Sequence, residues 1–91
     1  MNILTHNREE HQYTLHLEDG NQAYINYVLE GKKMMLTYSY VPPEARGTGV
    51  GHELVEKTFE MLTNEGFEAE AICSYIRVVA QRHTKWSEII G

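Results

Sequence analysis

The chain has 91 residues, a hydrophobic content of 42% and a net charge of −5, enough for one small domain that spans residues 1–91. The negative charge argues against general nucleic-acid binding, and no apolar run is long enough to cross a bilayer, so we expect no membrane association. The N-terminus lacks the basic-then-apolar pattern of a secretion signal, and Cys73 is the only cysteine. We therefore expect a cytoplasmic protein.

Three segments in the first half alternate apolar and polar residues, the pattern of strands with one buried face. They cover residues 11–18, 22–29 and 33–41, and short turns at 19–21 and 30–32 join them. The residues expected on the buried face are Tyr13, Leu15, Leu17, Ala23, Ile25, Tyr27, Leu29, Met34, Leu36, Tyr38 and Tyr40. Such strands form an antiparallel meander, to which residues 2–7 could add a short strand or an arm.

Histidines 6, 11 and 16 lie on or near the first strand without metal-ligand spacing. We interpret them as surface residues, and we expect no metal site.

The period changes after Pro42 and Pro43, which end the third strand. Apolar residues from Val50 to Leu62 follow helical spacing, and Gly66 is the expected C-terminal cap. Residues 67–73 read as a fourth strand, and Ser74 is the expected N-cap of a helix over residues 75–82. Residues 86–90 are expected to form a docking turn.

The predicted order is therefore β-β-β-α-β-α, a compact α/β (α+β) fold. A right-handed crossover makes the third and fourth strands parallel neighbours. The glycine-rich loop before the first helix and Cys73 then lie at the same edge of the sheet.

The loop belongs to the stretch VPPEARGTGVGHELV, residues 41–55, which has three glycines in five residues. Glycines ahead of a helix N-terminus let backbone N–H groups surround an anion, so the loop predicts a phosphate or pyrophosphate site. It lacks the Gly-Lys-Ser/Thr end of a Walker loop and the G-x-G-x-x-G spacing of a dinucleotide fold. A glycine-rich turn that only allows close packing is the remaining alternative.

The six residues Arg46-Gly47-Thr48-Gly49-Val50-Gly51 fit the R/Q-x-x-G-x-G/A signature of the GNAT superfamily of N-acetyltransferases, in the expected position between a strand and an amphipathic helix. The VPPEARG lead-in, the Cys73-Ser74-Tyr75 triplet and an Arg-His pair near the end of the last helix resemble a very small single-domain subfamily of GNAT-like proteins. The resemblance covers about residues 10–90.

The resemblance implies that acetyl-CoA is the co-substrate and that the acceptor is an unidentified amine, which could belong to a protein. It implies that the loop amides hold the pyrophosphate and that the strand ending near Val41 contacts the pantetheine arm. Charge is uneven along the chain, with five Lys/Arg against twelve Asp/Glu in residues 1–71 and three against one in residues 72–91. The basic end could suit an anionic ligand, although ordinary surface scatter explains it equally well. The expected cofactor-binding residues are Val41, Arg46, Gly47, Thr48, Gly49, Val50, Gly51, His52, Ser74 and Arg82.

Cys73 and Tyr75 are the candidate catalytic residues. A thiol before a helix N-terminus has a lowered pKa and could carry the acetyl group, but a lone cysteine is also a common small packing residue. The resemblance implies instead that a tyrosine such as Tyr75 protonates the CoA sulfur, and a packing role for Tyr75 is equally open. No base is adjacent to Cys73; His83 is about 15 Å along a continuous helix and a poor partner, whereas His52 could be nearer.

Full-length GNAT enzymes carry two helices after their first strand and additional C-terminal strands, which usually build the acceptor site. This sequence shows only a turn between its second and third strands. Three hypotheses therefore stay open: an N-acetyltransferase, a CoA-binding module without turnover, and a subunit whose acceptor site a partner or a second copy completes. We expect a monomer or a weak homodimer.

Overall fold

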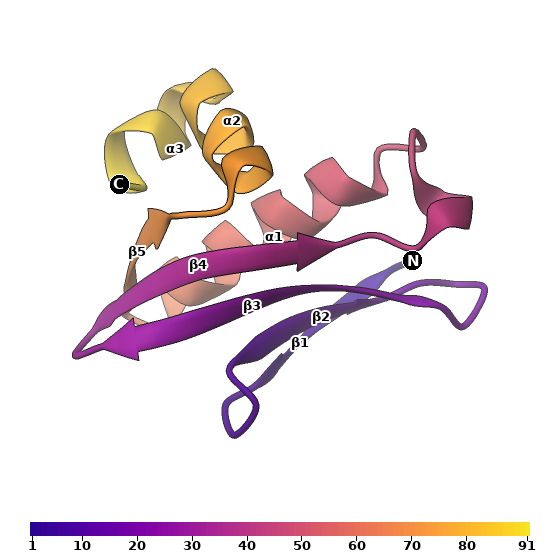
Figure 1. Cartoon of the computed structure of the whole chain (residues 1–91), viewed down its shortest axis with the longest axis horizontal. Coiled ribbons are helices and arrows are strands. Elements are labelled where there is room, and N and C mark those ends of the chain that lie inside the picture. Colours follow the sequence, from indigo (N-terminus) through magenta and orange to yellow (C-terminus); the bar gives the residue numbers. More distant parts are fainter.

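The computed structural model describes all residues 1–91 as a five-stranded sheet with three α-helices (Figure 1). The elements are β1 (Ile3–Asn7), β2 (Gln12–His16), β3 (Gln22–Glu30), β4 (Lys33–Tyr40), the 3₁₀ turn η1 (Pro43–Ala45), α1 (Val50–Asn64), β5 (Glu68–Ala71), α2 (Ser74–Arg82) and α3 (Thr84–Ile89). The strands lie in the order β1-β2-β3-β4-β5; the first four are antiparallel, and β5 runs parallel to β4. The predicted mixed α/β architecture is confirmed.

The N-terminal segment forms a strand, so the meander has four strands instead of three. β1 pairs with β2 in register from Ile3↔His16 to Asn7↔Gln12. This pairing corrects the interpretation of His6 as a surface residue. Its side chain is 5% exposed and stacks on Tyr13, and its ring nitrogens contact Glu65 and the Tyr27 hydroxyl. The apolar alternation of the strands does not reveal such a partly polar contact.

One face of the sheet supplies the core. Eighteen buried residues form a single hydrophobic cluster. Leu54, Val55, Phe59 and Leu62 of α1 face this cluster, and α2 and α3 add Ile76, Val79, Ala80 and Trp86. Figure 1 shows α1 crossing the sheet, with α2 and α3 beside the β5 edge. No buried hydrophobic residue of the strands comes from the opposite face.

The end of α1 forms as predicted. Gly66 has φ +86, the amide of Phe67 donates to the Leu62 carbonyl, and the amide of Gly66 donates to the Thr63 carbonyl. This pair of bonds is a Schellman motif, which requires the left-handed backbone that glycine adopts without strain.

The end of the chain corrects the expected docking turn. Residues Thr84–Ile89 form α3, because the side chain of His83 accepts a hydrogen bond from the Lys85 amide and so starts a new helix. Trp86 of α3 packs on Phe59 of α1 with ring centroids 5.4 Å apart. Histidine is not one of the residues preferred at a helix N-cap, so the sequence pattern does not predict a helix that begins after His83.

A β-bulge in β4 corrects the predicted faces of its last residues. Tyr38 pairs with Asn26 and Leu36 pairs with Tyr27, so Thr37 has no partner on β3. The additional residue reverses the alternation beyond it. Ser39, opposite the buried Ile25, therefore lies on the core face. The predicted core positions Tyr38 and Tyr40 lie on the other face, against Tyr24.

β5 is shorter than the predicted strand over residues 67–73. Its last pair with β4 is Leu36↔Ala71. The amides of Ile72 and Cys73 both donate to the Leu36 carbonyl, at 3.0 and 2.9 Å, and the chain then turns into α2. Cys73, instead of Ser74, is the N-cap of α2, and Ser74 is its first helical residue.

Thr58 in α1 offers a stability prediction. It is fully buried, and its hydroxyl has no hydrogen-bond partner in the structure. Thr58→Val keeps the shape and removes the unpaired polar atom, so we expect it to raise the free energy of unfolding by about 1 kcal/mol. Urea unfolding of both proteins measures this change; a loss of stability would show that the hydroxyl has a partner in solution.

No helix in the structure has the length and apolar character needed to cross a membrane.

Candidate active site

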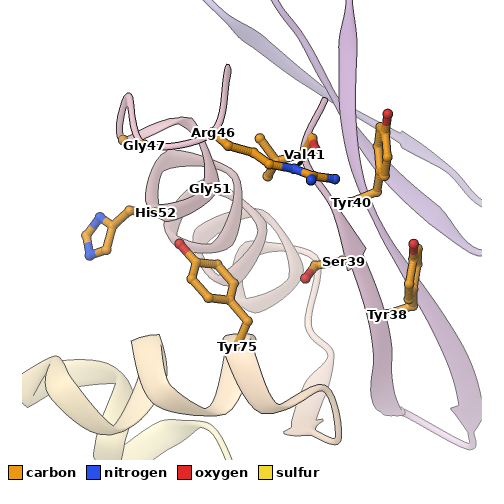
Figure 2. A pocket seen from close by; sticks show the side chains of 10 residues that line it. Tyr38, Ser39, Tyr40, Val41, Arg46, Gly47, Gly51, His52 and Tyr75 are labelled. Carbon is orange, nitrogen blue, oxygen red and sulfur yellow. Dashed lines mark hydrogen bonds between the residues drawn. The ribbon is translucent and has the colours of Figure 1, made fainter. Parts of the chain in front are cut away.

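A cleft of about 490 Å³ opens where the end of β4, the glycine loop and the first turns of α1 and α2 meet (Figure 2). Its lining residues are Tyr38, Ser39, Tyr40, Val41, Arg46, Gly47, Gly49, Gly51, His52 and Tyr75. One wall is therefore a strand end, and the opposite wall is formed by helix N-termini.

Two of the loop glycines are required by backbone conformation. Gly47 has φ +80 and Gly49, the N-cap of α1, has φ +91. Both values lie in the left-handed region that side chains disfavour. A Cβ at either position would meet no atom within 4 Å, so the space beside the loop is open.

The loop and the first turn of α1 present unpaired amides to this space. The first helical hydrogen bond runs from the Glu53 amide to the Gly49 carbonyl at 3.0 Å. The amides of Gly47, Gly49, Val50, Gly51 and His52 have no hydrogen-bond acceptor within the protein. Together with the dipole of a 15-residue helix, they form a site that favours an anion.

Gly51 has a different role from the other two glycines. Its φ is not positive, but a Cβ there would lie 2.8 Å from the Tyr75 hydroxyl oxygen. The missing side chain therefore lets the Tyr75 ring pack against the first turn of α1. Figure 2 shows the Tyr75 hydroxyl beside Gly51, and that hydroxyl has no hydrogen-bond partner in the protein.

The strand wall of the cleft has an open edge. β4 continues to Tyr40, whereas its last pair with β5 is at Leu36. Residues 38–40 therefore pair with β3 on one side, and no strand pairs with residues 37–40 on the other. An extended chain with amide groups could bind along this edge as an additional strand would.

Arg46 and His52 are the basic residues that line the cleft. The Nε atom of Arg46 donates to the Val41 carbonyl at 3.0 Å, so the side chain spans from the loop to the strand (Figure 2). This bond leaves the terminal nitrogens of the guanidinium for a ligand. His52, on the first turn of α1, is 58% exposed.

Cys73 lies at the N-terminus of α2, beside Ser39 of β4. Its Sγ atom is 3.4 Å from the Ser39 Oγ atom, and Ser39 lines the cleft. Partial burial raises the pKa of the Cys73 thiol, but the Ser39 hydroxyl and the backbone amides of Ile76, Tyr75 and Ser39 outweigh it, so the pKa is lowered overall. The predicted acidic thiol therefore has a physical basis in these donors.

The alkylation rate of Cys73 provides a test of this environment. The thiolate is the reactive form, so the rate should rise to half its maximum at a pH below that of an ordinary thiol, about 8.5. Ser39→Ala removes one donor to the thiolate and should move the midpoint to higher pH. Iodoacetamide labelling followed by intact mass gives both midpoints; identical midpoints would show that Ser39 does not affect the thiol.

The structure brings seven of the predicted site residues to the cleft: Val41, Arg46, Gly47, Gly49, Gly51, His52 and Tyr75. The other predicted residues are not among its lining residues: Thr48, Val50, Cys73, Ser74 and Arg82. Thr48 turns its hydroxyl to the Ala45 carbonyl, and Val50 packs against the core.

Sequence reasoning missed three lining residues, Tyr38, Ser39 and Tyr40. Their place depends on the bulge at Thr37, which no glycine or proline marks in the sequence. No group of three or more His, Cys, Asp or Glu side chains is arranged to hold a metal ion.

A glycine-rich helix N-terminus lies beside an open strand edge of a mixed sheet, and comparison with known proteins gives the class of protein. Residues 12–89 match the family model of the GCN5-related N-acetyl-transferases. The chain therefore belongs to the GCN5-related N-acetyltransferase family. Its fold resembles the solution NMR structure of a GCN5-like protein from Staphylococcus aureus, with a TM-score of 0.71, 18% identity and coverage of 98% of this chain and 87% of that one.

Proposed function

We propose that the protein is an N-acetyltransferase that takes its acetyl group from acetyl-CoA and transfers it to an amine. The observation that carries the proposal is that one cleft is lined both by loop residues with unpaired amides, Gly47, Gly49, Gly51 and His52, and by the open edge of β4. Family membership supports the reaction class.

The residues present fit acetyl-CoA as a substrate. Its pyrophosphate suits the amides of Gly47, Gly49, Val50, Gly51 and His52, and the open space beside Gly47 and Gly49 admits it. Its pantetheine arm contains two amide groups in an extended chain, which suits the unpaired edge of residues 37–40. Arg46 adds a positive charge between the two.

The transfer step requires protonation of the departing CoA sulfur. In direct transfer, the amine nitrogen forms a bond to the acetyl carbon and the carbon–sulfur bond breaks. The thiolate takes a proton from the donor, the nitrogen loses a proton to solvent, and solvent reprotonates the donor. We propose Tyr75 as the proton donor, because it lines the cleft and its hydroxyl is free of protein partners.

Cys73 offers a second route. Its sulfur would form a thioester with the acetyl group, and CoA would leave as the thiol with the cysteine proton. The amine would then attack this thioester, the bond from the acetyl carbon to the cysteine sulfur would break, and the sulfur would take the proton that the amine loses. Ser39 supports this route, since it contacts both the thiol and the cleft. Tyr75 lines the cleft and Cys73 does not, which favours direct transfer with Tyr75 as the main route.

One observation favours a different function. Only turns connect the successive strands from β1 through β4. No helix is therefore inserted between them to enclose an acceptor beside the cleft. This lack of an inserted helix is expected of a CoA-binding module without turnover. It is also expected of a subunit whose acceptor site a partner completes.

Incubation with acetyl-CoA separates these functions. Release of free CoA, measured with and without added amines, reports turnover, and intact mass reports acylation. An N-acetyltransferase releases CoA and acetylates the amine. The cysteine route adds about 42 Da, one acetyl group, which hydroxylamine removes and Cys73→Ala prevents. CoA binding with no release under any condition would favour the binding module or the subunit whose acceptor site a partner completes.

A further inference from the structure

The last residues of β4 present two tyrosine rings on the face of the sheet opposite the buried core. Figure 2 shows Ser39 on the cleft side of the strand, toward Tyr75, and the rings of Tyr38 and Tyr40 on its other side. Both tyrosines nevertheless line the cleft, because β5 stops pairing with β4 at Leu36 and leaves the strand edge open. The open edge of β4 therefore connects the cleft to the other face of the sheet.

The two rings are held in place by a third tyrosine. Tyr24 of β3 stacks on Tyr40, with ring centroids 5.2 Å apart and planes at 26°, and packs on Tyr38 at 6.2 Å. The side chain of Tyr38 remains 50% exposed. An exposed ring that leans on a fixed neighbour offers a preformed surface for another aromatic ring.

The strand neighbours of these rings are uncharged. Thr14 lies opposite Tyr24, and Asn26 lies opposite Tyr38. The side chain of Gln12 bonds to both of these polar residues, donating to Asn26 at 3.0 Å and accepting from Thr14 at 3.0 Å. The polar neighbours therefore satisfy one another, and a cation on the rings would find no carboxylate among them. A surface of this composition suits an uncharged aromatic ligand.

The charges of the cleft disfavour a protonated amine. Arg46 brings a positive charge to the strand end through its bond to the Val41 carbonyl, and the helix N-terminus adds to the same field. No Asp or Glu side chain lines the cleft to remove a proton from an ammonium group, and the His52 ring points away from the strand wall (Figure 2).

This environment matters because an amine must be unprotonated to attack the acetyl carbon. An aliphatic amine resembles the lysine side chain, whose pKa of about 10.4 keeps it protonated at pH 7. An aromatic amine is unprotonated at this pH, because its lone pair is delocalised into the ring. The cleft is therefore suited to an acceptor that arrives without a proton to lose before the attack.

We propose that the acetyl acceptor is an aromatic amine whose ring stacks on Tyr38 and Tyr40 and whose nitrogen reaches the acetyl group across the open edge of β4. This inference rests on the proposed function, because acetyl-CoA in the cleft supplies the acetyl group. The nitrogen bonds to the acetyl carbon and the carbon–sulfur bond breaks. The thiolate takes a proton from Tyr75, the nitrogen loses one to solvent, and solvent reprotonates Tyr75. An acceptor held on the sheet in this way needs no inserted helix to enclose it.

The test compares aniline with cyclohexylamine as acceptors at pH 7. The two rings have the same number of carbon atoms, but cyclohexylamine is not planar and is protonated. With saturating acetyl-CoA, the rate of CoA release should give aniline a kcat/KM at least about tenfold above that of cyclohexylamine, although the aliphatic nitrogen is the stronger nucleophile once unprotonated.

Two variants of Tyr38 test the stacking surface. Tyr38→Leu keeps an apolar side chain and removes the ring, so the KM for aniline should rise at least about threefold, with little change in kcat or in the affinity for acetyl-CoA. Tyr38→Phe keeps the ring and should keep the native KM. Val28→Ala is the matched control, because Val28 is an exposed apolar residue of β3 that does not line the cleft. It should also keep the native KM.

A kcat/KM for cyclohexylamine equal to or above that for aniline would overturn the inference and leave the proposed function intact. Equal KM values for aniline in Tyr38→Leu and Tyr38→Phe would do the same. Binding of acetyl-CoA without transfer to aniline, to cyclohexylamine or to a lysine-containing peptide would contradict the proposed function and the inference together.

Discussion

A Tyr75→Phe variant is expected to transfer acetyl groups at least about 100-fold more slowly than the native protein, with little change in its affinity for CoA. The variant keeps the ring that packs against Gly51 and loses only the hydroxyl, the free proton donor that lines the cleft. Steady-state rates with saturating acetyl-CoA and an amine measure the loss, and calorimetry measures the affinity.

Tyr24→Phe is the matched control for this variant. Tyr24 lies on the opposite face of the sheet, stacked on Tyr40, and is not a lining residue of the cleft. It should keep the native rate. A Tyr75→Phe variant that also keeps the native rate, with a large loss in Cys73→Ala, would assign the chemistry to the cysteine route.

Gly49→Val is expected to weaken CoA binding at least about tenfold, which corresponds to about 1.4 kcal/mol. Gly49 is the N-cap of α1 with φ +91, and valine strongly disfavours that conformation. The loop would shift, the amides would no longer converge, and the new side chain would enter the space beside them. Calorimetric titration with CoA measures the change.

The sequence offers a close control for backbone strain. Gly20, in the turn between β2 and β3, has φ +89, and a Cβ there would also meet no atom within 4 Å. Gly20→Val should reduce stability through the same strain and leave CoA affinity unchanged. Equal affinities in the two variants would remove the anion-binding role of the loop.

Local patterns predicted much of this fold because local energetics determine those parts. The alternation in β2 and β3 is confirmed by the buried Tyr13, Leu15, Ala23 and Ile25, and the helical spacing after Val50 is confirmed by α1. The Gly66 cap formed as expected, since its left-handed backbone is a property of one residue and its neighbours. The glycine loop was predicted for the same reason, because its signal also lies in neighbouring residues.

Features that depend on pairing between distant segments were not predicted. The bulge at Thr37 appears only when β3 and β4 are aligned, and it decides that Ser39 faces the core side while Tyr38 and Tyr40 face away. The burial of His6 depends on Glu65, which lies 59 positions along the chain. α3 begins at a histidine cap that also contacts Glu56 of another helix. Each of these requires a tertiary partner that periodicity does not reveal.

The three loop glycines show the same limit within one motif. Their spacing predicted an anion site, but it did not distinguish their roles. Gly47 and Gly49 provide left-handed backbone, whereas Gly51 leaves room for the Tyr75 ring from α2. The link between Gly51 and the proposed proton donor therefore became visible only in the folded chain.

The measurement that tests the central claim most directly is a titration of ¹⁵N-labelled protein with CoA, followed through its backbone amide signals. If the unpaired amides hold the pyrophosphate, the largest shifts should come from Gly47, Gly49, Val50, Gly51 and His52, with smaller shifts in residues 37–40 of β4. Unchanged signals in the loop and the first turn of α1, at CoA concentrations that perturb other parts of the chain, would contradict the account.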